Sequence, residues 1–443
     1  MSGQPVVQYA SRTDVGMRRS ANQDSLAVRL CRASPEWEEC GHLFVVADGM
    51  GGHSVGDLAS RITVETLPLA YFKIESDSVP DRLLTAVTTA NRAIHDKARE
   101  NPEFADMGTT CSALVLSPHG AYVGHVGDSR VYRIRSGEIQ QLTFDHSLQW
   151  EMVRLGRATL TNVDTLHPRN VITRCLGPDQ DVTIDVEGPF HVQTGDHFVL
   201  CSDGLTNHVK DSEIGAIASG LGPAEASRLL VDIANCRGGS DNTTVVVVRV
   251  DDFPQLTGEF VDAPLPVANQ KKVDPNQKSG FREILSRISL YVFLLLGVSG
   301  LGCLALKQVT PGLLLICPAL ILGFLRFIAL QNRPSGPEAG DTSEPAVNSS
   351  ATVPEESGIA AASPYRRTSA KPTQEFLGFL SAAQSELVQA ARDNGWEVDF
   401  DTLSRQDVDS VQALREGKLR QFLSLRASAI DSLMKEFYAR ARR

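Results

Sequence analysis

The sequence predicts an α+β protein with an N-terminal domain of antiparallel strands and helices, then a helical hairpin, then an all-helical C-terminal segment. Short apolar runs joined by turn residues occur at 111–116, 121–126, 131–134 and 138–142, which is the pattern of an antiparallel meander. Apolar residues at helical spacing occur on both sides of these runs. Two long uncharged runs, 288–306 and 309–325, separate this mixed domain from the helical pattern near the C-terminus.

The N-terminal domain is expected to cover residues 1–252. Strands are predicted at 8–15, 25–30, 43–47, 198–202 and 243–250, and helices at 57–72, 81–100, 147–155, 211–219 and 223–235. The stretch 157–169 is expected to be a mobile flap. Residues 253–287 are expected to be a basic linker, because they contain Pro, Lys and Gln without a clear apolar period.

The composition limits the class of function. The net charge of −10 argues against nucleic acid as a partner, since clustered carboxylates repel a phosphate backbone. The eight cysteines form no C-x-x-C pair, which favours buried thiols in a reducing compartment over a zinc site or a disulfide framework. The N-terminus lacks the apolar core of a signal peptide, so the first domain is predicted to stay in the cytoplasm.

Residues 288–330 are predicted to form a transmembrane helical hairpin. Each uncharged run is close to the roughly 20 residues that a helix needs to cross a bilayer. Basic residues flank the pair on both sides, whereas the turn contains only Lys307, so both flanks are expected in the cytoplasm. The predicted location is therefore the inner or plasma membrane, with the N-terminal domain and the C-terminus cytoplasmic. A hairpin that enters only one leaflet is the alternative.

The C-terminal part divides into two predicted segments. Residues 331–373 are rich in Ser, Pro, Ala, Glu and Thr and are predicted to be a disordered linker. Within it, residues 366–369 (RRTS) are a candidate phosphorylation site, although such strings are common. Residues 374–443 are predicted to be a helical segment, either a small bundle or a module that docks a partner. The basic end of this segment is interpreted as a solvated helix end or a contact for lipid headgroups.

Acidic residues at the ends of predicted strands define the candidate site. Asp48 and Asp203 each follow an apolar run and precede a glycine, Asp128 lies between two apolar runs, and Asp241 precedes the last strand. A carboxylate at the end of a buried strand is costly unless a partner such as a divalent cation neutralises it. Oxygen ligands favour Mg²⁺ or Mn²⁺ over zinc. For any one of these residues, the alternative is an aspartate that opens a turn.

Two divalent ions held by such residues can share a water molecule, lower its pKa and present hydroxide in line with a phosphorus atom. Asp48 is a candidate to bridge both ions, with the Gly49 carbonyl completing one coordination shell. Arg19 lies in a polar turn and offers the planar donor that a phosphate group binds. Taken alone, Arg19 would be read as a surface charge.

Eight short motifs occur in order along residues 8–250 and together closely resemble the bacterial members of the protein phosphatase 2C family, which are metal-dependent protein serine/threonine phosphatases. They are residues 19–24 (RSANQD), 46–53 (VADGMGGH), 107–110 (MGTT), 126–130 (VGDSR), 145–147 (DHS), 170–174 (NVITR), 201–205 (CSDGL) and 241–244 (DNTT). The resemblance implies two packed antiparallel β-sheets flanked by helices, an αββα sandwich, with the metals in a cleft at one edge.

The resemblance also implies a role for each site residue. Asp48 would bridge two Mn²⁺ or Mg²⁺ ions, with the Gly49 carbonyl, Asp203 and Asp241 as further ligands. Asp128 would bind a third, looser ion, together with Asp203. Arg19 would hold the substrate phosphate. Asp24 would order metal-bound water from outside the ligand set, where Gln23 also lies.

Two residues depart from the pattern of the family. Gln23 stands where many relatives have an acidic residue, so we expect somewhat weaker metal binding. Met50 stands where eukaryotic relatives have a histidine that is proposed to protonate the leaving oxygen. Because methionine has no proton to give, general acid catalysis at this position is excluded, as in bacterial relatives. His53 is close in sequence, but a structural role is preferred for it.

The predicted function is that of a membrane-tethered phosphatase that removes phosphate from phosphoserine and phosphothreonine on proteins by direct attack of metal-activated water. Its expected partners are phosphorylated proteins, serine/threonine kinases or their substrates, and the membrane. Two alternatives stay open. One is a catalytically silent module that binds phosphoproteins, and the other is a phosphohydrolase for small molecules.

Overall fold

Two antiparallel sheets form the centre of the computed structural model, which describes residues 5–52, 55–76, 78–155, 157, 168, 171–253 and 366–441. These residues all belong to one of the two units of the chain, Met1–Val267 with Glu356–Arg443, and the other unit, Ala268–Glu355, lies outside the described residues. In the first sheet the strand order is β1-β11-β10-β7-β8-β12. Its strands are β1 (Val6–Asp14), β7 (Arg130–Arg135), β8 (Glu138–Gln141), β10 (His197–Cys201), β11 (Thr243–Asp252) and β12 (Arg367–Ser369).

The second sheet has the order β2-β3-β5-β6-β9, and the short strand β4 also pairs with β3. Its strands are β2 (Asp24–Arg29), β3 (His42–Met50), β4 (Gly108–Thr109), β5 (Cys111–Ser117), β6 (Gly120–Val126) and β9 (Asp185–Phe190). The predicted meander is therefore divided between the two sheets, because the chain leaves β6 in the second sheet and enters β7 in the first.

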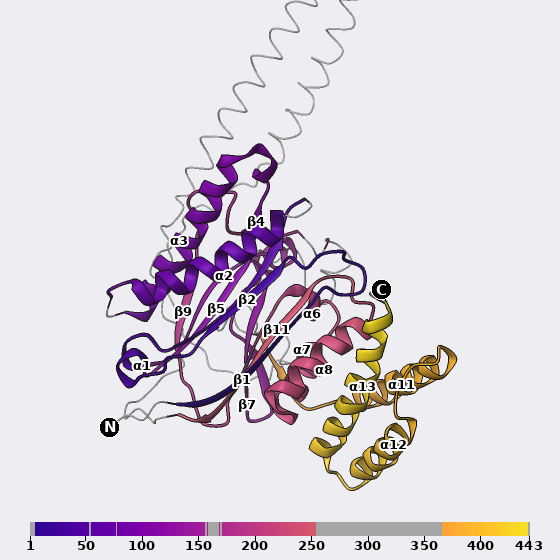
Figure 1. Ribbon diagram of the computed structural model, residues 1–443. Coiled ribbons are helices and arrows are strands. Elements are labelled where there is room, and N and C mark those ends of the chain that lie inside the picture. The colour runs from indigo at the N-terminus through magenta and orange to yellow at the C-terminus, as the bar shows by residue number, and fades with distance from the viewer. Residues whose placement is uncertain are drawn as a thin grey trace, which may run out of the picture. The chain divides into compact units, whose positions relative to one another are not determined.

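Helices cover the outer face of each sheet (Figure 1). The second sheet carries α2 (Val55–Lys73) and α3 (Val79–Glu100), and the first carries α7 (Asp211–Gly220) and α8 (Pro223–Cys236). Shorter helices are α1 (Ser34–Cys40), η1 (Pro102–Phe104), α4 (Leu148–Arg154) and α6 (Asp203–Thr206). This arrangement confirms the predicted α+β class, with two antiparallel sheets flanked by helices.

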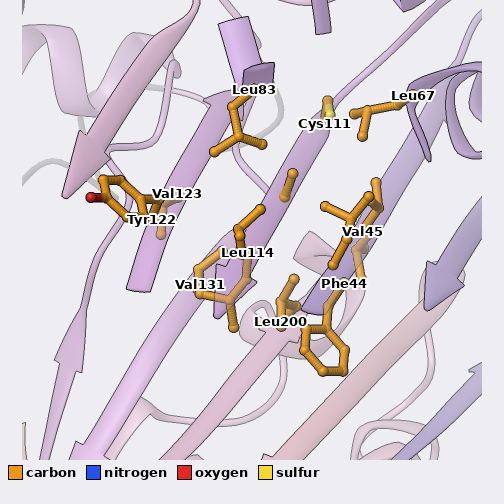
Figure 2. Packing of buried hydrophobic residues seen from close by; sticks show 14 of the residues in the cluster. Phe44, Val45, Leu67, Leu83, Cys111, Leu114, Tyr122, Val123, Val131 and Leu200 are labelled. Atoms are coloured by element: carbon orange, nitrogen blue, oxygen red, sulfur yellow. The ribbon is translucent and has the colours of Figure 1, made fainter. Parts of the chain in front are cut away.

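The main core fills the space between the sheets. Phe44 and Leu114 are paired neighbours in the second sheet, and they pack toward Val131 and Leu200 of the first (Figure 2). All four side chains are fully buried, and each contributes about 1.5–3 kcal/mol by leaving water. Strand β11 is buried on both faces, since its valines alternate between this core and the core under α7 and α8.

The C-terminal helices pack on the outer helices of the first sheet. They are α11 (Gln374–Asp393), α12 (Phe400–Arg415) and α13 (Leu419–Ala441). Apolar residues of α13 join the core formed with α7 and α8, and the buried ones include Phe422, Leu423, Ile430, Met434 and Tyr438. In Figure 1, α13 accordingly lies beside α8. A second small cluster, which includes Trp396 and Leu433, holds the three C-terminal helices together.

Part of the predicted disordered linker is ordered. Residues 367–369 form strand β12, which pairs with β8 at the edge of the first sheet. The pairing extends on both sides, where Gln141 N donates to Arg366 O at 2.9 Å and Ala370 N donates to Gly137 O at 2.8 Å. The polar side chains of this strand are exposed, so its local sequence carried no strand signal. The open edge of β8 supplies the hydrogen-bond partners instead. Apart from residues 157 and 168, the predicted flap lies outside the described residues.

The predicted membrane location must be corrected. Among the residues that the structure describes, no helix is both long and apolar enough to cross a bilayer. The segment 288–330, on which that prediction depended, lies outside the described residues. A membrane location therefore has no support in the structure.

Candidate active site

The predicted site residues meet where strands of both sheets end. Asp24 and Asp48 are direct partners across the β2–β3 ladder. Asp203 is the first residue of α6, two residues after the end of β10. Asp241 lies two residues before β11, the neighbour of β10 in the first sheet. Strand ends of two packed sheets thus bring together carboxylates that are far apart in the chain.

Burial and mutual repulsion perturb these carboxylates strongly. Burial raises the pKa of Asp48 well above its ordinary value, and the charges of Asp24, Asp203, Asp128 and Asp241 raise it further. Burial likewise raises the pKa of Asp24 to about 7 and that of Asp128 to about 8. The pKa of Asp203 is raised first by burial and then by Asp241. Such a cluster holds protons near neutral pH unless cations replace them.

Two of these carboxylates each have a buried oxygen atom without a hydrogen-bond partner in the described part of the chain. Asp24 Oδ2 accepts a hydrogen bond from Ser202 Oγ at 2.7 Å. Within the described part of the chain, however, Asp24 Oδ1 and Asp128 Oδ1 are buried without a hydrogen-bond partner. Buried carboxylate oxygens are normally paired, so these two point to a missing proton or cation.

The backbone around Asp48 is fixed at three points. Asp48 N donates to Thr110 Oγ1 at 2.9 Å, and Thr110 N donates to Asp48 O at 2.8 Å. Gly49 N donates to Gln23 O at 3.1 Å. A Cβ at Gly49 would collide with the carbonyl oxygen of Gly56, so only glycine fits here. The Asp-Gly step is therefore held rigidly at the end of β3.

Arg19 lies on a loop that is tied to the beginning of β11. Its Nη2 is 2.8 Å from Asp241 Oδ2, and its side chain is 49% exposed. Asn242 fixes the loop, because its Nδ2 donates to Val15 O and Ala21 O at 2.9 Å each while its Oδ1 accepts from Gln23 N at 2.8 Å. The predicted phosphate anchor and a predicted metal ligand are thus in direct contact.

The C-terminal helices reach the same loop through a polar chain. Tyr438 Oη donates to Asp232 Oδ1 at 3.0 Å and accepts from Asn235 Nδ2 at 2.8 Å. Asn235 Nδ2 also donates to Asp14 Oδ1 at 3.1 Å, and that oxygen accepts from Gly16 N at 2.9 Å. Gly16 has a φ of +78° and begins the loop that carries Arg19.

Asp203 and Asp128 border a cavity of about 680 Å³. Its lining also includes Arg130 and Asp145, which form a buried ion pair with contacts of 2.6–3.0 Å. The lining also contains residues 366–368, at strand β12. The site therefore opens into a space that is lined by residues within 128–212 and by residues 366–368.

Several functional neighbours were not assigned a role from the sequence. Asn242, Ser202 and Thr110 all lie within the quoted motifs, yet their hydrogen bonds to the site could not be read from spacing. The only signal for them in the sequence is that Ser202 and Asn242 are adjacent to predicted ligands and that Thr110 belongs to the motif at residues 107–110. Residues 366–368 gave no signal for the site at all.

Gln23 and Met50, the two residues that differ from the family pattern, are both held by contacts of their backbone atoms. Gln23 contacts the site through its backbone, whose carbonyl also accepts from Ser60 Oγ at 2.6 Å. Met50 pairs with Gly108 in the β3–β4 ladder. His53 lies outside the described residues.

The donor set fits hard cations such as Mg²⁺ and Mn²⁺, because it consists of carboxylates with free oxygen atoms in a buried acidic cluster. The fit is chemical rather than geometric. Within the described ranges, no three side chains of His, Cys, Asp or Glu are arranged as a ready-made ion site.

The sheets and the acidic site define a class of protein, a phosphohydrolase that works with divalent metal ions. The model of the family Protein phosphatase 2C matches residues 17–223. Protein phosphatase PhpP of Streptococcus pneumoniae is 34% identical over 244 residues, which are 54% of this chain and 96% of that protein.

Solved structures show the same likeness. The serine/threonine phosphatase of S. agalactiae is 34% identical, with a TM-score of 0.50, and the match covers 55% of this chain and all of that one. The catalytic domain of serine threonine protein phosphatase PstP, solved in complex with 2 manganese ions, is 32% identical, with a TM-score of 0.48 over 56% of this chain and 99% of that one. The chain belongs to the protein phosphatase 2C family, whose members are metal-dependent serine/threonine protein phosphatases.

Proposed function

We propose that this chain hydrolyses phosphoserine and phosphothreonine on proteins, with Mn²⁺ or Mg²⁺ as its cofactors. One observation carries the proposal. Carboxylates from the ends of both sheets form a buried acidic cluster with free oxygen atoms, and an arginine lies in contact with it. A cluster of this kind is costly to the fold, so we infer that it is kept for the cations that it binds.

The roles that we propose follow from this geometry. Asp48, Asp203, Asp241 and the Gly49 carbonyl would hold two ions, and Asp128 with Asp203 would hold a third. When bound, the ions would lower the pKa of water and offset the charge of the phosphate group. Because Met50 cannot donate a proton, the leaving oxygen must receive its proton from another source.

Arg19 is proposed to bind the substrate phosphate. Its guanidinium can share its donors between Asp241 and a phosphate oxygen, which would place the ester beside the ligands. Asp24, held by Ser202 Oγ, would act as an acceptor next to the ions rather than as a ligand, and Gln23 would help through its backbone contacts to Gly49 and Asn242.

The exposure of Arg19 favours a protein substrate over a small molecule. A phosphate anchor with a side chain that is 49% exposed can be reached by a phosphorylated segment of a folded protein. A site specialised for a small molecule normally encloses most of its ligand. The proposed substrates are therefore phosphoproteins, among them serine/threonine kinases or the proteins that they phosphorylate.

The test compares phosphate release from phosphothreonine peptides and from para-nitrophenyl phosphate, each with Mn²⁺ or with EDTA. The matched variants are Asp203→Asn and Asp409→Asn, which removes the same charge from an exposed position on α12. We expect Mn²⁺-dependent release that falls by at least about 100-fold in Asp203→Asn, since about 3 kcal/mol of stabilisation is lost, and stays unchanged in Asp409→Asn. Binding of phosphopeptides without turnover would support the silent module. Faster turnover of small esters than of any phosphopeptide would support the small-molecule enzyme.

A further inference from the structure

The C-terminal strand β12 forms one wall of the cavity beside the proposed metal site. The lining includes Asp128 and Asp203 together with Arg366, Arg367 and Thr368. The matched family region ends at residue 223, and the 244-residue match to PhpP covers 96% of that protein. This wall therefore lies outside the matched family region.

Most charged groups around this cavity already have a partner. Arg130 pairs with Asp145 at 2.6 Å, and Arg366 pairs with Asp211 at 3.3 Å. Arg366 is also placed over the ring of Trp150, with 5.4 Å from its Cζ to the ring centroid. Both arginines are therefore fixed parts of the wall rather than free cations.

Two basic side chains of the lining remain available to a ligand. Arg367 is exposed, and within the described residues it has no ion-pair partner. Lys210 Nζ lies 3.3 Å from Glu375, but the two side chains are 66% and 81% exposed. An exposed pair of this kind is worth at most about 1 kcal/mol, so an incoming anion can replace Glu375.

The other charged groups of the lining would not repel an anion. Asp128 and Asp203 are the proposed cation ligands, Asp145 and Asp211 are paired, and His208 Nε2 is hydrogen-bonded to Ser240 Oγ at 2.8 Å. With the cations bound, the uncommitted charge of the described lining is positive. An anionic group on the substrate is the complementary chemistry.

We propose that Arg367 and Lys210 form a subsite for a second anionic side chain of the substrate protein, a carboxylate or a second phosphate, beside the phosphoester that is hydrolysed. This inference rests on the proposed function. It assigns to β12 a direct part in substrate selection, since this strand is held by hydrogen bonds to β8 and its Arg367 lines the cavity.

The test uses full-length protein and phosphothreonine peptides in which one residue, either Glu, phosphoserine, Ala or Lys, is moved along both sides of the phosphothreonine. The variants are Arg367→Glu and Lys210→Glu, with Arg415→Glu on an exposed position of α12 as the matched charge reversal. Because Arg367 joins the sheet through its backbone, its side chain can be changed without removing a ladder hydrogen bond. Thermal unfolding checks that each variant folds.

At the best position, wild type should favour Glu over Lys by about 3- to 10-fold in kcat/KM, as expected for one or two exposed ion pairs. Arg367→Glu should abolish or reverse this ratio, Arg415→Glu should keep it, and about 0.5 M salt should weaken it. A larger gain with phosphoserine than with Glu would identify the subsite as one for phosphate. Equal ratios in wild type and Arg367→Glu, or no charge preference at any position, would overturn the subsite.

A binding experiment distinguishes failure of the subsite from failure of the proposed function. The affinities of the same labelled peptides for Asp203→Asn, alone and combined with Arg367→Glu, are measured by fluorescence anisotropy with Mn²⁺ present. If no peptide is hydrolysed by wild type, the proposed function fails. The subsite then stands or falls on whether Arg367→Glu removes the preference for the anionic peptide in binding.

Discussion

Metal-free protein should be destabilised by its own active site as the pH rises, and Asp24→Asn isolates one part of this effect. Asp24 is 6% exposed, and one of its carboxylate oxygens has no partner within the described residues. Burial raises its pKa from the ordinary 3.8 to about 7. In the absence of metal, folded protein therefore keeps a proton on Asp24 over a pH range in which the unfolded chain has released it.

The direction and the size of this effect of pH on stability follow from proton linkage. Between about pH 4 and pH 7 the unfolded state binds fewer protons, so stability falls as the pH rises, by about 1.4 kcal/mol per pH unit. The contribution of Asp24 is fully present below pH 3.8 and is lost through the folded pKa of about 7. Its cost is about 2 kcal/mol at pH 5 and about 4 kcal/mol at pH 8. Asparagine abolishes this cost and also removes a charge that raises the pKa of Asp48.

The assay is urea unfolding in EDTA at pH 5 and pH 8 for wild type, Asp24→Asn and the exposed control Asp409→Asn. The amide group that Asp24→Asn introduces has a polar atom without a hydrogen-bond partner. The penalty for this atom is the same at both pH values, so it cancels in the comparison. We expect the stability advantage of Asp24→Asn over wild type to grow by about 3 kcal/mol from pH 5 to pH 8. The advantage of Asp409→Asn should not change. If the difference for Asp24→Asn is equal at the two pH values, the electrostatic reasoning is wrong.

Three further predictions test other parts of the fold. Burial lowers the pKa of His42 from 6.5 to about 4, and its Nδ1 accepts from Cys31 N. Wild type should therefore lose about 3 kcal/mol of stability relative to His42→Gln as the pH falls from about 6.5 to 4, measured by urea unfolding. Gly204→Ala should reduce phosphatase activity by more than about 10-fold, because its Cβ would collide with Asn242 O and displace the start of β11. Gly222→Ala, which has open space around it, is the control, and equal activities would refute this. Tyr438→Phe should lower the free energy of unfolding by about 1–3 kcal/mol in a chemical denaturation experiment, since it removes a hydrogen-bond partner of Asp232 and one of the two partners of Asn235.

The parts of the fold that could be predicted from the sequence are those with a local signal. Strand β3 is an apolar run that ends in Asp48-Gly49, and β10 is another that ends before Asp203. In both cases the residues that make the strand also place the aspartate at its end. The C-terminal helices were predictable for a similar reason, since a stripe of apolar residues identifies the face of α13 that is buried.

The parts that could not be predicted depend on partners that are distant in sequence. Asn242 fixes the Arg19 loop through contacts more than 200 residues away. Ser202 holds Asp24 across a similar separation. Strand β12 is polar and only three residues long, and it exists because β8 offers an unpaired edge. Neither spacing nor composition contains this information.

The position of β12 is decided by the helices that follow it. The three residues of β12 each lose about 1–2 kcal/mol of backbone conformational entropy when they become ordered. A three-residue strand cannot offset this, because its few hydrogen bonds contribute about 1 kcal/mol each. Five buried side chains of α13 (Phe422, Leu423, Ile430, Met434 and Tyr438) contribute about 1.5–3 kcal/mol each when they pack with α7 and α8. Docking of α13 therefore keeps β12 on the edge of β8, and the wall of the cavity that carries Arg367 lasts as long as that docking does.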